Sequence, residues 1–455
     1  MVKYQWNNLH SVFFSTLVEQ LNHNNVKYFL LRNYEQLPEH NIGKDVDIII
    51  EPGKYQIAAN SLKTTMKLLN ITYYTVTQFD RMRCWYIMDI KKNFGIHIDI
   101  IENENYKGFE FFKFKELYTH TIKYKSFYVL EPAMDCAMLL IQNIVAYKSL
   151  KEKYQVKISE TYSSNKKEID AILFNFFGHE IGKEITELLN QNNYAKIIAH
   201  AKKYETTAIK QIFKKRPFYT FRNIIRFLVG KFYRIIICPK KFWRFFAVEA
   251  PDGTGKTTFI NNLISRLQYF YNAPETRFNV HHFRPSLLPN LGAVGEKAKV
   301  MKQDKDFTNP HRAKPAGKIS SLIRMAYYWM DYLIGVPFLL RKEVQYEQYT
   351  IFDRYIYDFL VDPKRSRINL PLWLRKLFVK CTIQPKVVFV LDADADTIYQ
   401  RKQELTLNEI NRQLIVFRNL TSSNKRFHKI DANKSPEEVV DQAIEVIFNQ
   451  FLNRL

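Results

Sequence analysis

The sequence has few cysteines, few glycines and no long apolar run. Its four cysteines lie far apart and form no C-x-x-C pair. This pattern excludes a disulfide framework and a cysteine-rich zinc site, and it is typical of a reducing compartment. No uncharged stretch of about 18 apolar residues occurs, and the first residues do not form an apolar signal core. We therefore expect a soluble cytoplasmic protein.

Acidic residues are also scarce, so the formal net charge is +23. A basic balance suits phosphate-bearing substrates, nucleic acid or an anionic membrane face. A coding bias toward lysine, asparagine and isoleucine produces the same balance, so the charge alone does not choose a partner. The length of 455 residues predicts two or three domains.

Residues 245–258, FFAVEAPDGTGKTT, carry the strongest motif. A short apolar strand enters a glycine loop, and apolar residues then recur at helical spacing. Glycine lets the loop turn its N–H groups inward, and the helix start favours an anion, so this context predicts a phosphate-binding loop. Ala250 stands where the usual pattern begins with glycine. The expected nucleotide-binding residues are Asp252, Gly253, Thr254, Gly255, Lys256, Thr257 and Thr258.

The remainder of this region alternates strands and helices. Strands are expected at residues 279–283, 349–352, 386–391 and 427–430, and helices at 319–345, 397–420 and 435–451. This order predicts an α/β domain with a parallel sheet flanked by helices. Polar residues such as Asp353 and Arg354 follow the strands, where ligands bind in such sheets. Residues 286–315 are irregular and basic, which favours a loop at the mouth of a site.

The N-terminal region has a different pattern. A helix is expected at residues 8–22, and strands at 26–31, 45–50 and 95–101. Asp45 and Asp47 are two residues apart and share one face of their strand, and Asp99 lies in a later strand. Three such carboxylates form a cage suited to Mg²⁺. The alternative is that Asp45 and Asp47 only occupy an exposed strand end.

This N-terminal part resembles the nucleotidyltransferase superfamily, in which a strand, a Gly-Ser turn, D-x-D and a later acidic residue build the site. The resemblance implies an α+β fold with Asp45, Asp47 and Asp99 as metal ligands. Arg32-Asn33 replaces the Gly-Ser turn, and a fold of this type without activity is an open alternative. From residue 131 the pattern becomes helical. The expected domains are therefore 1–130, nucleotidyltransferase-like; 131–243, a helical extension and basic linker; and 244–455.

Residues 206–248 contain no acidic residue and eleven lysines and arginines, interleaved with aromatic residues. An interdomain helix with long basic side chains explains this composition. A basic aromatic helix can also lie on an anionic membrane surface, which would place the protein at the inner face of the membrane. Nucleic acid is a less favoured partner.

Residues 244–455 resemble the thymidylate kinase family. The carrying motifs are EAPDGTGKTT, Asp353-Arg354-Tyr355, Leu391-Asp392 followed by Arg401, and Ile430-Asp431. A divergent group of this family matches also through HHFRP, FDRYIYD and RKQEL, and its genes often accompany those for bacterial surface polysaccharides. The resemblance implies a P-loop kinase that uses ATP and Mg²⁺.

The roles that this resemblance implies fall on individual residues. Lys256 would hold phosphates, and Thr257 and Asp353 would hold Mg²⁺. Arg354 would clamp the acceptor, and Arg401 with Lys402 would neutralise the transferring phosphoryl group. The family's thymine-pocket stretch is replaced by residues 356–360, so the acceptor stays open between a nucleotide and a phosphorylated or sugar-type compound.

We expect an ATP- and Mg²⁺-dependent phosphotransferase fused to a nucleotidyltransferase-like domain. One alternative is an ordinary thymidylate or nucleoside-monophosphate kinase with an inert N-terminal domain. Another is a non-catalytic nucleotide-binding scaffold at a membrane surface. The family resemblance also implies a homodimer.

Overall fold

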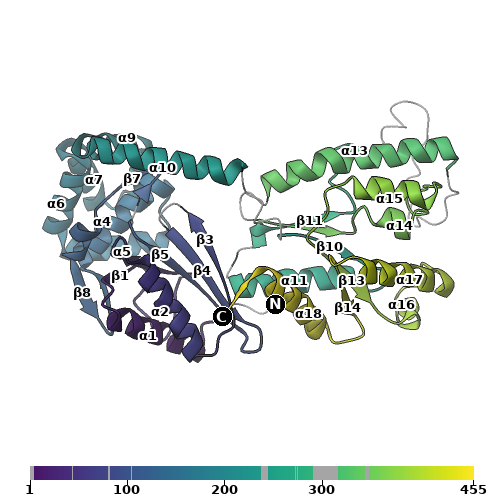
Figure 1. Ribbon diagram of the computed structural model, residues 1–455. Coiled ribbons are helices and arrows are strands. Elements are labelled where there is room, and N and C mark those ends of the chain that lie inside the picture. Colours follow the sequence, from purple (N-terminus) through teal and green to yellow (C-terminus); the bar gives the residue numbers. More distant parts are fainter. Residues whose placement is uncertain are drawn as a thin grey trace. The chain divides into compact units, whose positions relative to one another are not determined.

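The computed structural model describes residues 5–43, 45–79, 82–103, 105–236, 244–271, 273, 275–289, 316–343 and 348–455. The chain divides into two compact units. The N-terminal unit comprises Tyr4–Tyr233 together with Phe270–Asn272 and Asn453–Leu455. The C-terminal unit is built mainly of Arg234–Tyr269 and Ala273–Leu452. Figure 1 labels the elements of both units.

An eight-stranded mixed sheet forms the centre of the N-terminal unit. Its strand order is β15-β3-β4-β5-β2-β1-β9-β8. The strands are β15 (Asn453–Arg454), β3 (Tyr73–Phe79), β4 (Met82–Asp89), β5 (Phe94–Ile101), β2 (Val46–Ile50), β1 (Tyr28–Leu31), β9 (Phe127–Leu130) and β8 (Thr121–Tyr124). β2 and β5 run parallel, with Asp47 opposite Asp99. This register brings the two predicted ligand strands together.

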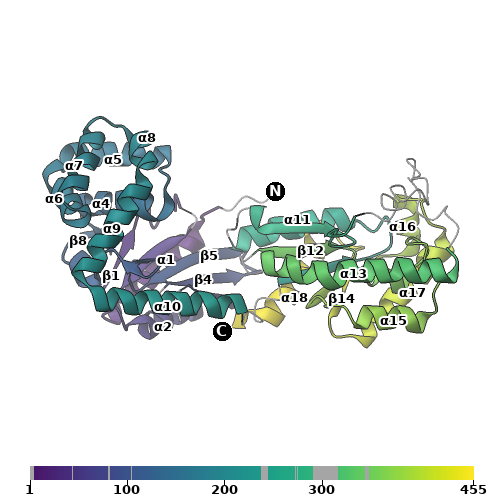
Figure 2. The ribbon, with the colours of Figure 1, turned by 90° about the horizontal axis from the view of Figure 1, so that it is seen from above.

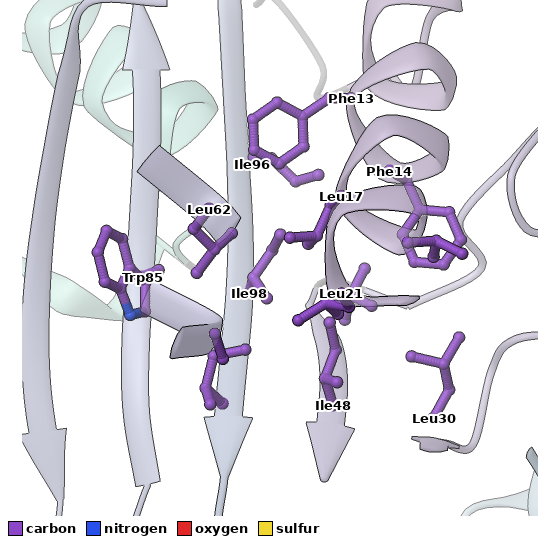
Figure 3. Packing of buried hydrophobic residues seen from close by; sticks show 14 of the residues in the cluster. Phe13, Phe14, Leu17, Leu21, Leu30, Ile48, Leu62, Trp85, Ile96 and Ile98 are labelled. Atoms are coloured by element: carbon purple, nitrogen blue, oxygen red, sulfur yellow. The ribbon is translucent and has the colours of Figure 1, made fainter. Parts of the chain in front are cut away.

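Helices α1 (Asn8–His23) and α2 (Tyr55–Leu68) cover one face of this sheet. Figure 3 shows Phe13, Phe14, Leu17 and Leu21 of α1 pointing toward the strand residues. These α1 side chains are fully buried, and they share one cluster with Leu62, Trp85 and Ile98. The apolar period of α1 therefore explains why this helix docks on the sheet.

The opposite face of the sheet packs against α3 (Phe114–Tyr118) and α4 (Pro132–Gln142). The chain then forms a helical group with its own core. Its members after α4 are a π-helical turn at Asn143–Tyr147, α5 (Glu152–Ser164), α6 (Lys166–Phe177), α7 (His179–Asn190), α8 (Tyr194–Ala199) and α9 (Ala201–Lys215). The long helix α10 (Pro217–Ile236) follows. Two short strands, β6 (Asn105–Tyr106) and β7 (Phe109–Glu110), pair with each other.

The C-terminal unit contains a five-stranded parallel sheet in the order β11-β12-β10-β13-β14. The strands are β10 (Phe245–Glu249), β11 (Phe278–His282), β12 (Tyr349–Asp353), β13 (Val387–Asp392) and β14 (Phe427–Asp431). Helices α13 (Lys318–Lys342) and α17 (Leu407–Ser423) pack on one face. Helix α11 (Lys256–Tyr271) packs on the other, where Phe259 contacts Phe389. The remaining helices are a 3-10 turn at Glu275–Arg277, α14 (Asp358–Val361), α15 (Leu372–Lys380), α16 (Ala395–Arg401) and α18 (Pro436–Phe451).

The predicted fold class is confirmed: the chain is a multidomain α/β protein whose parallel sheet is flanked by helices. The expected helix at residues 397–420 is divided in two, and the helical region after residue 131 is interrupted at Gly178. Gly178, at φ +85°, separates α6 from α7, and residues 402–406 separate α16 from α17. Strands β3, β4, β8 and β9 of the N-terminal sheet were not among the expected strands. Most of the expected basic loop, residues 290–315, lies outside the described residues, and so do residues 237–243 of the basic segment.

The proposed domain limits at residues 130 and 243 stay predictions. Within the described part of the chain, no helix has the length and apolar character needed to cross a membrane.

Candidate functional site

The phosphate-binding motif lies at the centre of the C-terminal sheet. β10 is buried along its whole length because parallel strands flank it on both sides. The loop leaves this strand and α11 begins at Lys256, so the first-turn N–H groups of α11 face the loop. Gly253 and Gly255 adopt φ values of +88° and +93°. Glycine is required there because other residues are strained in this region.

Gly255 also opens the loop to a ligand. A Cβ placed on Gly255 would meet no atom within 4 Å, so its surroundings are open space. At Gly253 a Cβ would come within 3.0 Å of the Lys402 Cβ and 3.1 Å of the Ile398 carbonyl oxygen. The two glycines therefore serve different ends: Gly253 permits close packing, and Gly255 leaves room beside the loop.

Lys256 folds back across its own loop. Its Nζ donates to the carbonyl oxygens of Ala250 and Pro251, both at 3.0 Å, and lies 3.7 Å from Asp252 Oδ1. Burial, and then the positive charge of Arg354, lower the pKa of Lys256 to about 8. Thr254 closes the same turn through its hydroxyl, 2.8 Å from the Pro251 oxygen. Thr257 and Thr258 are exposed in the first turn of α11.

Asp353 and Arg354 lie at the carboxyl end of β12, directly beside β10. Val248 is opposite Asp353, and the Arg354 N–H donates to the Val248 oxygen at 2.9 Å. Arg354 adopts φ +70°, which is uncommon for a bulky residue and often marks a functional site. Its guanidinium is buried between Asp252 and Asp358, and Nη1 donates to Asp358 Oδ2 at 3.0 Å.

The two oxygens of Asp353 have different surroundings. Oδ2 lies 3.3 Å from His282 Nδ1, whereas Oδ1 is buried without a hydrogen-bond partner among the described residues. Burial raises the pKa of Asp353, but His282 and Lys256 outweigh this effect and hold the pKa below its usual value. The carboxylate is therefore charged, and one of its oxygens is available to a cation.

These features fit a bound nucleotide with Mg²⁺. Gly255 leaves space for phosphates, Thr257 presents a hydroxyl, and Asp353 offers a carboxylate oxygen that no group in the described part of the chain contacts by a hydrogen bond. A buried polar atom without a partner requires an explanation, and a bound ion supplies one. Hydroxyl and carboxylate oxygens are the donors that Mg²⁺ prefers.

A cavity of about 300 Å³ lies beside the glycine loop. Arg401, the last residue of α16, lines it together with Thr254, Gly255 and Thr258. Its other lining residues are Phe259, Asn262, Leu391, Ala432, Lys434, Pro436 and Val439. Arg401 therefore lies at the same cavity as the glycine loop, although the two are about 145 residues apart in the sequence. Lys402 is exposed, and its Nζ is 3.1 Å from Glu404 Oε1.

Two residues of this site, Arg365 and Glu249, were not among the expected site residues. Arg365 donates to Asp252 Oδ2 at 2.6 Å, so two guanidinium groups share one carboxylate. Glu249 is fully buried and accepts the Tyr355 N–H at 2.8 Å. Burial, and then the charge of Asp358, raise the pKa of Glu249 well above its usual value. Arg365 lies in a basic turn. The basic residues of such turns usually contact only solvent, so the sequence did not indicate a functional role for Arg365.

The N-terminal unit brings the three predicted carboxylates together. The ligand atoms of Asp45, Asp47 and Asp99 all lie within 4.8 Å of one another. Burial, opposed by Arg32 but reinforced by Asp45 and Asp99, raises the pKa of Asp47 to about 6. The three carboxylates offer the oxygen donors that Mg²⁺ prefers.

Arg32 already neutralises part of this negative charge. Its Nε donates to Asp47 Oδ2 at 2.8 Å. Arg32 and Asn33 adopt φ values of +34° and +58°. The chain therefore makes a left-handed turn here without glycine, and Arg32 places a cation beside Asp47.

His97 and Cys84 also reach this cluster. His97 Nε2 is 2.8 Å from Asp99 Oδ1, and the ring stacks on Tyr86 at 4.2 Å. Cys84 lies opposite Asp99 in the sheet, and ligand atoms of Cys84, His97 and Asp99 lie within 4.8 Å of one another. Burial raises the pKa of Asp99, but His97 outweighs it, so the net pKa is lowered. Neither His97 nor Cys84 was among the expected metal ligands.

Comparisons with known proteins give little beyond this geometry. No protein-family model matches the chain, and no curated protein matches it. Among solved structures, the chain is similar to thymidylate kinase from Ehrlichia chaffeensis, with 17% identity and a TM-score of 0.30. The similarity covers 45% of this chain and 97% of that one. At such values the functional assignment rests on the side chains described above.

Proposed function

We propose that the C-terminal unit is an ATP- and Mg²⁺-dependent phosphotransferase of the thymidylate kinase type. The observation that carries this proposal is the pair of adjacent strand ends at β10 and β12. One presents a glycine loop with Lys256, and the other presents Asp353, one buried oxygen of which has no hydrogen-bond partner among the described residues. A phosphate cradle and a cation ligand side by side are the parts that phosphoryl transfer needs.

Bound ATP would supply the phosphoryl group, and Mg²⁺ would supply positive charge at its oxygens. Thr257 and Asp353 would hold the ion. Lys256 leaves its carbonyl partners to contact phosphate oxygens. Arg401, at the rim of the cavity, neutralises charge on the phosphoryl group, and Arg354 orients the acceptor.

The acceptor is a nucleotide, or a phosphorylated or sugar-type compound. Asp252 can accept from a sugar hydroxyl, while Arg354 and Arg365 can bind an acceptor phosphate. The three groups are already adjacent, so an acceptor would exchange with their mutual ion pairs. The residues after Arg354 offer no argument for thymine in particular.

The N-terminal unit is proposed to be nucleotidyltransferase-like. Its supporting observation is the cluster formed by Asp47 and Asp99, on the adjacent strands β2 and β5, together with Asp45 just before β2. The Arg32–Asp47 ion pair neutralises one of the three carboxylates, so a fold of this type without activity stays the alternative. Nucleotidyl transfer from a nucleoside triphosphate that Asp45→Ala leaves unchanged would refute a role for this cluster.

ATP consumption by the purified full chain tests the kinase proposal. Wild-type protein and Lys256→Ala are compared over dTMP, other nucleoside monophosphates and sugar phosphates. Lys376→Ala, an exposed lysine of α15, is the matched control and should keep full activity. Turnover that Lys256→Ala abolishes supports the proposal, and turnover that survives this change contradicts it.

The identity of the active acceptor separates the alternatives. Turnover with dTMP indicates an ordinary nucleotide kinase. Turnover only with a non-nucleotide acceptor favours the surface-polysaccharide setting. ATP binding without turnover on any acceptor favours the non-catalytic scaffold, held at a membrane surface by the basic segment. The oligomeric state, proposed to be a homodimer, is measured on the same preparation by light scattering.

A further inference from the structure

Helix α10 is attached to the N-terminal unit along one side. Tyr219 donates to Glu110 Oε2 at 2.6 Å, and Thr220 and Asn223 are buried. Ile224 lies so close to Gly108 that an added Cβ on this glycine would be 2.8 Å from the Ile224 Cα. These contacts hold one side of α10 against the N-terminal unit. The opposite side of the helix therefore points away from this unit. Figure 2 shows α10 as one continuous helix.

The opposite side of α10 is apolar and exposed. Six large apolar side chains share it, with exposed fractions from 46% to 89%: Phe218, Phe221, Ile225, Leu228, Val229 and Phe232. At about 100° per residue, these positions fall within roughly 100° of the helix circumference. Single exposed apolar residues are ordinary, whereas a continuous stripe of this length marks an interaction surface.

Positive charge accompanies this stripe. Arg222 and Arg226 follow it along one edge, and Lys231 lies beyond the other. The sequence from residue 206 to residue 248 contains no acidic side chain. A partner that covers the stripe therefore has to be apolar in its interior and negatively charged at its surface.

We propose that the exposed face of α10 docks on an anionic membrane surface. An acidic bilayer has both required properties, since acyl chains lie directly beneath negatively charged headgroups. The helix would lie parallel to the surface, with its six apolar side chains inserted and Arg222 at headgroup level. This surface is independent of the phosphate-binding loop and does not rest on the kinase activity.

The charge pattern also distinguishes the bilayer from other partners. A second copy of the chain would bring two basic stripes without acidic residues into contact, and like charges repel. A nucleic acid would match the charge, and its bases can stack on phenylalanine, but it would leave the aliphatic side chains of Ile225, Leu228 and Val229 without apolar contacts. The bilayer alone uses both features.

Vesicle flotation of the full chain tests the proposal. The vesicles contain phosphatidylcholine alone, or phosphatidylcholine with phosphatidylglycerol, each at low and high salt. We expect binding to the anionic vesicles that weakens with salt. The double variant Phe221→Gln/Leu228→Gln should bind about tenfold or more weakly, because two inserted side chains are lost. Lys256→Ala should bind like the wild type.

Matched controls keep the result specific. Val156→Gln and Leu68→Gln change equally exposed apolar residues on other helices of the same unit, at 57% and 59% exposure, and should bind normally. Arg222→Gln/Lys231→Gln should weaken binding mainly at low salt. Because every substituted side chain is exposed, circular dichroism should show native folding.

Two results would overturn the proposal. One is absence of binding to the anionic vesicles at low salt. The other is binding that the Phe221→Gln/Leu228→Gln change leaves unaltered. If this same change instead dissociates a dimer seen by light scattering, while vesicles are not bound, the stripe is a contact between copies of the chain.

Discussion

Lys256 combines burial with neighbouring charges of both signs, and its pKa of about 8 has a consequence for ATP capture. The pKa is lowered from its ordinary 10.5, so the ammonium group loses its proton at a lower pH than an exposed lysine does. We expect the affinity of the free protein for ATP to fall as the pH rises through about 8. Equilibrium titration with ATP across this range measures the effect. Lys256→Met should bind ATP weakly at every pH, because it lacks the titrating ammonium group. A wild-type affinity that stays constant across this pH range would contradict the prediction.

Arg365 lies in a turn after α14 and extends its side chain to Asp252 of the glycine loop. Its guanidinium and that of Arg354 hold the two oxygens of Asp252. Charged hydrogen bonds of this type contribute about 1.5–3 kcal/mol. We expect Arg365→Ala to lower kcat/KM for the active acceptor by roughly tenfold or more.

Steady-state kinetics at saturating ATP measure this change. Lys364→Ala, the exposed neighbouring residue, is the control and should leave the kinetics unaltered. A normal kcat/KM in Arg365→Ala would show that this arginine only stabilises the loop.

At the scale of elements, the start of α18 offers a clean test of local stability. Ser435 Oγ accepts from the Glu438 N–H, and the Glu438 carboxylate accepts from the Ser435 N–H at 3.1 Å. Losing such a cap costs about 1 kcal/mol. Ser435→Ala should therefore lower the free energy of unfolding by about that amount in urea denaturation. Ser422→Ala, within α17 and exposed, should have little effect, and equal losses in both variants would argue against the cap.

The sequence predicts those structural elements that are determined by a few neighbouring residues. The loop at Gly253 and Gly255, the strand that ends in Asp353 and the cap at Ser435 each carry their signal within a few residues. The two strands β3 and β4 were missed because their mixed aromatic and polar residues have no clean period. The pairing of Arg32 with Asp47 and of Arg365 with Asp252 depends on tertiary contacts over 15 and 113 residues, which no local pattern encodes.

At the scale of the molecule, each unit has its own hydrophobic core. Phe13, Leu17 and Ile98 belong to one cluster, whereas Tyr332, Phe352 and Tyr355 belong to another. Each candidate site gathers around the strand ends of a single sheet, with Asp45, Asp47 and Asp99 in one unit and Lys256 and Asp353 in the other. The local geometry of each site is therefore set by its own unit.

This separation predicts two independent activities in one chain. Lys256→Ala should abolish phosphorylation of the acceptor but retain nucleotidyl transfer to an acceptor that is already phosphorylated. Asp45→Ala should have the opposite effect. Because a phosphorylated intermediate can diffuse, a mixture of the two variants should restore the complete conversion, which radiolabelled triphosphates and chromatography can follow. If natively folded Lys256→Ala also fails with the phosphorylated acceptor while wild-type protein succeeds, the two sites are energetically coupled and the prediction of independence is wrong.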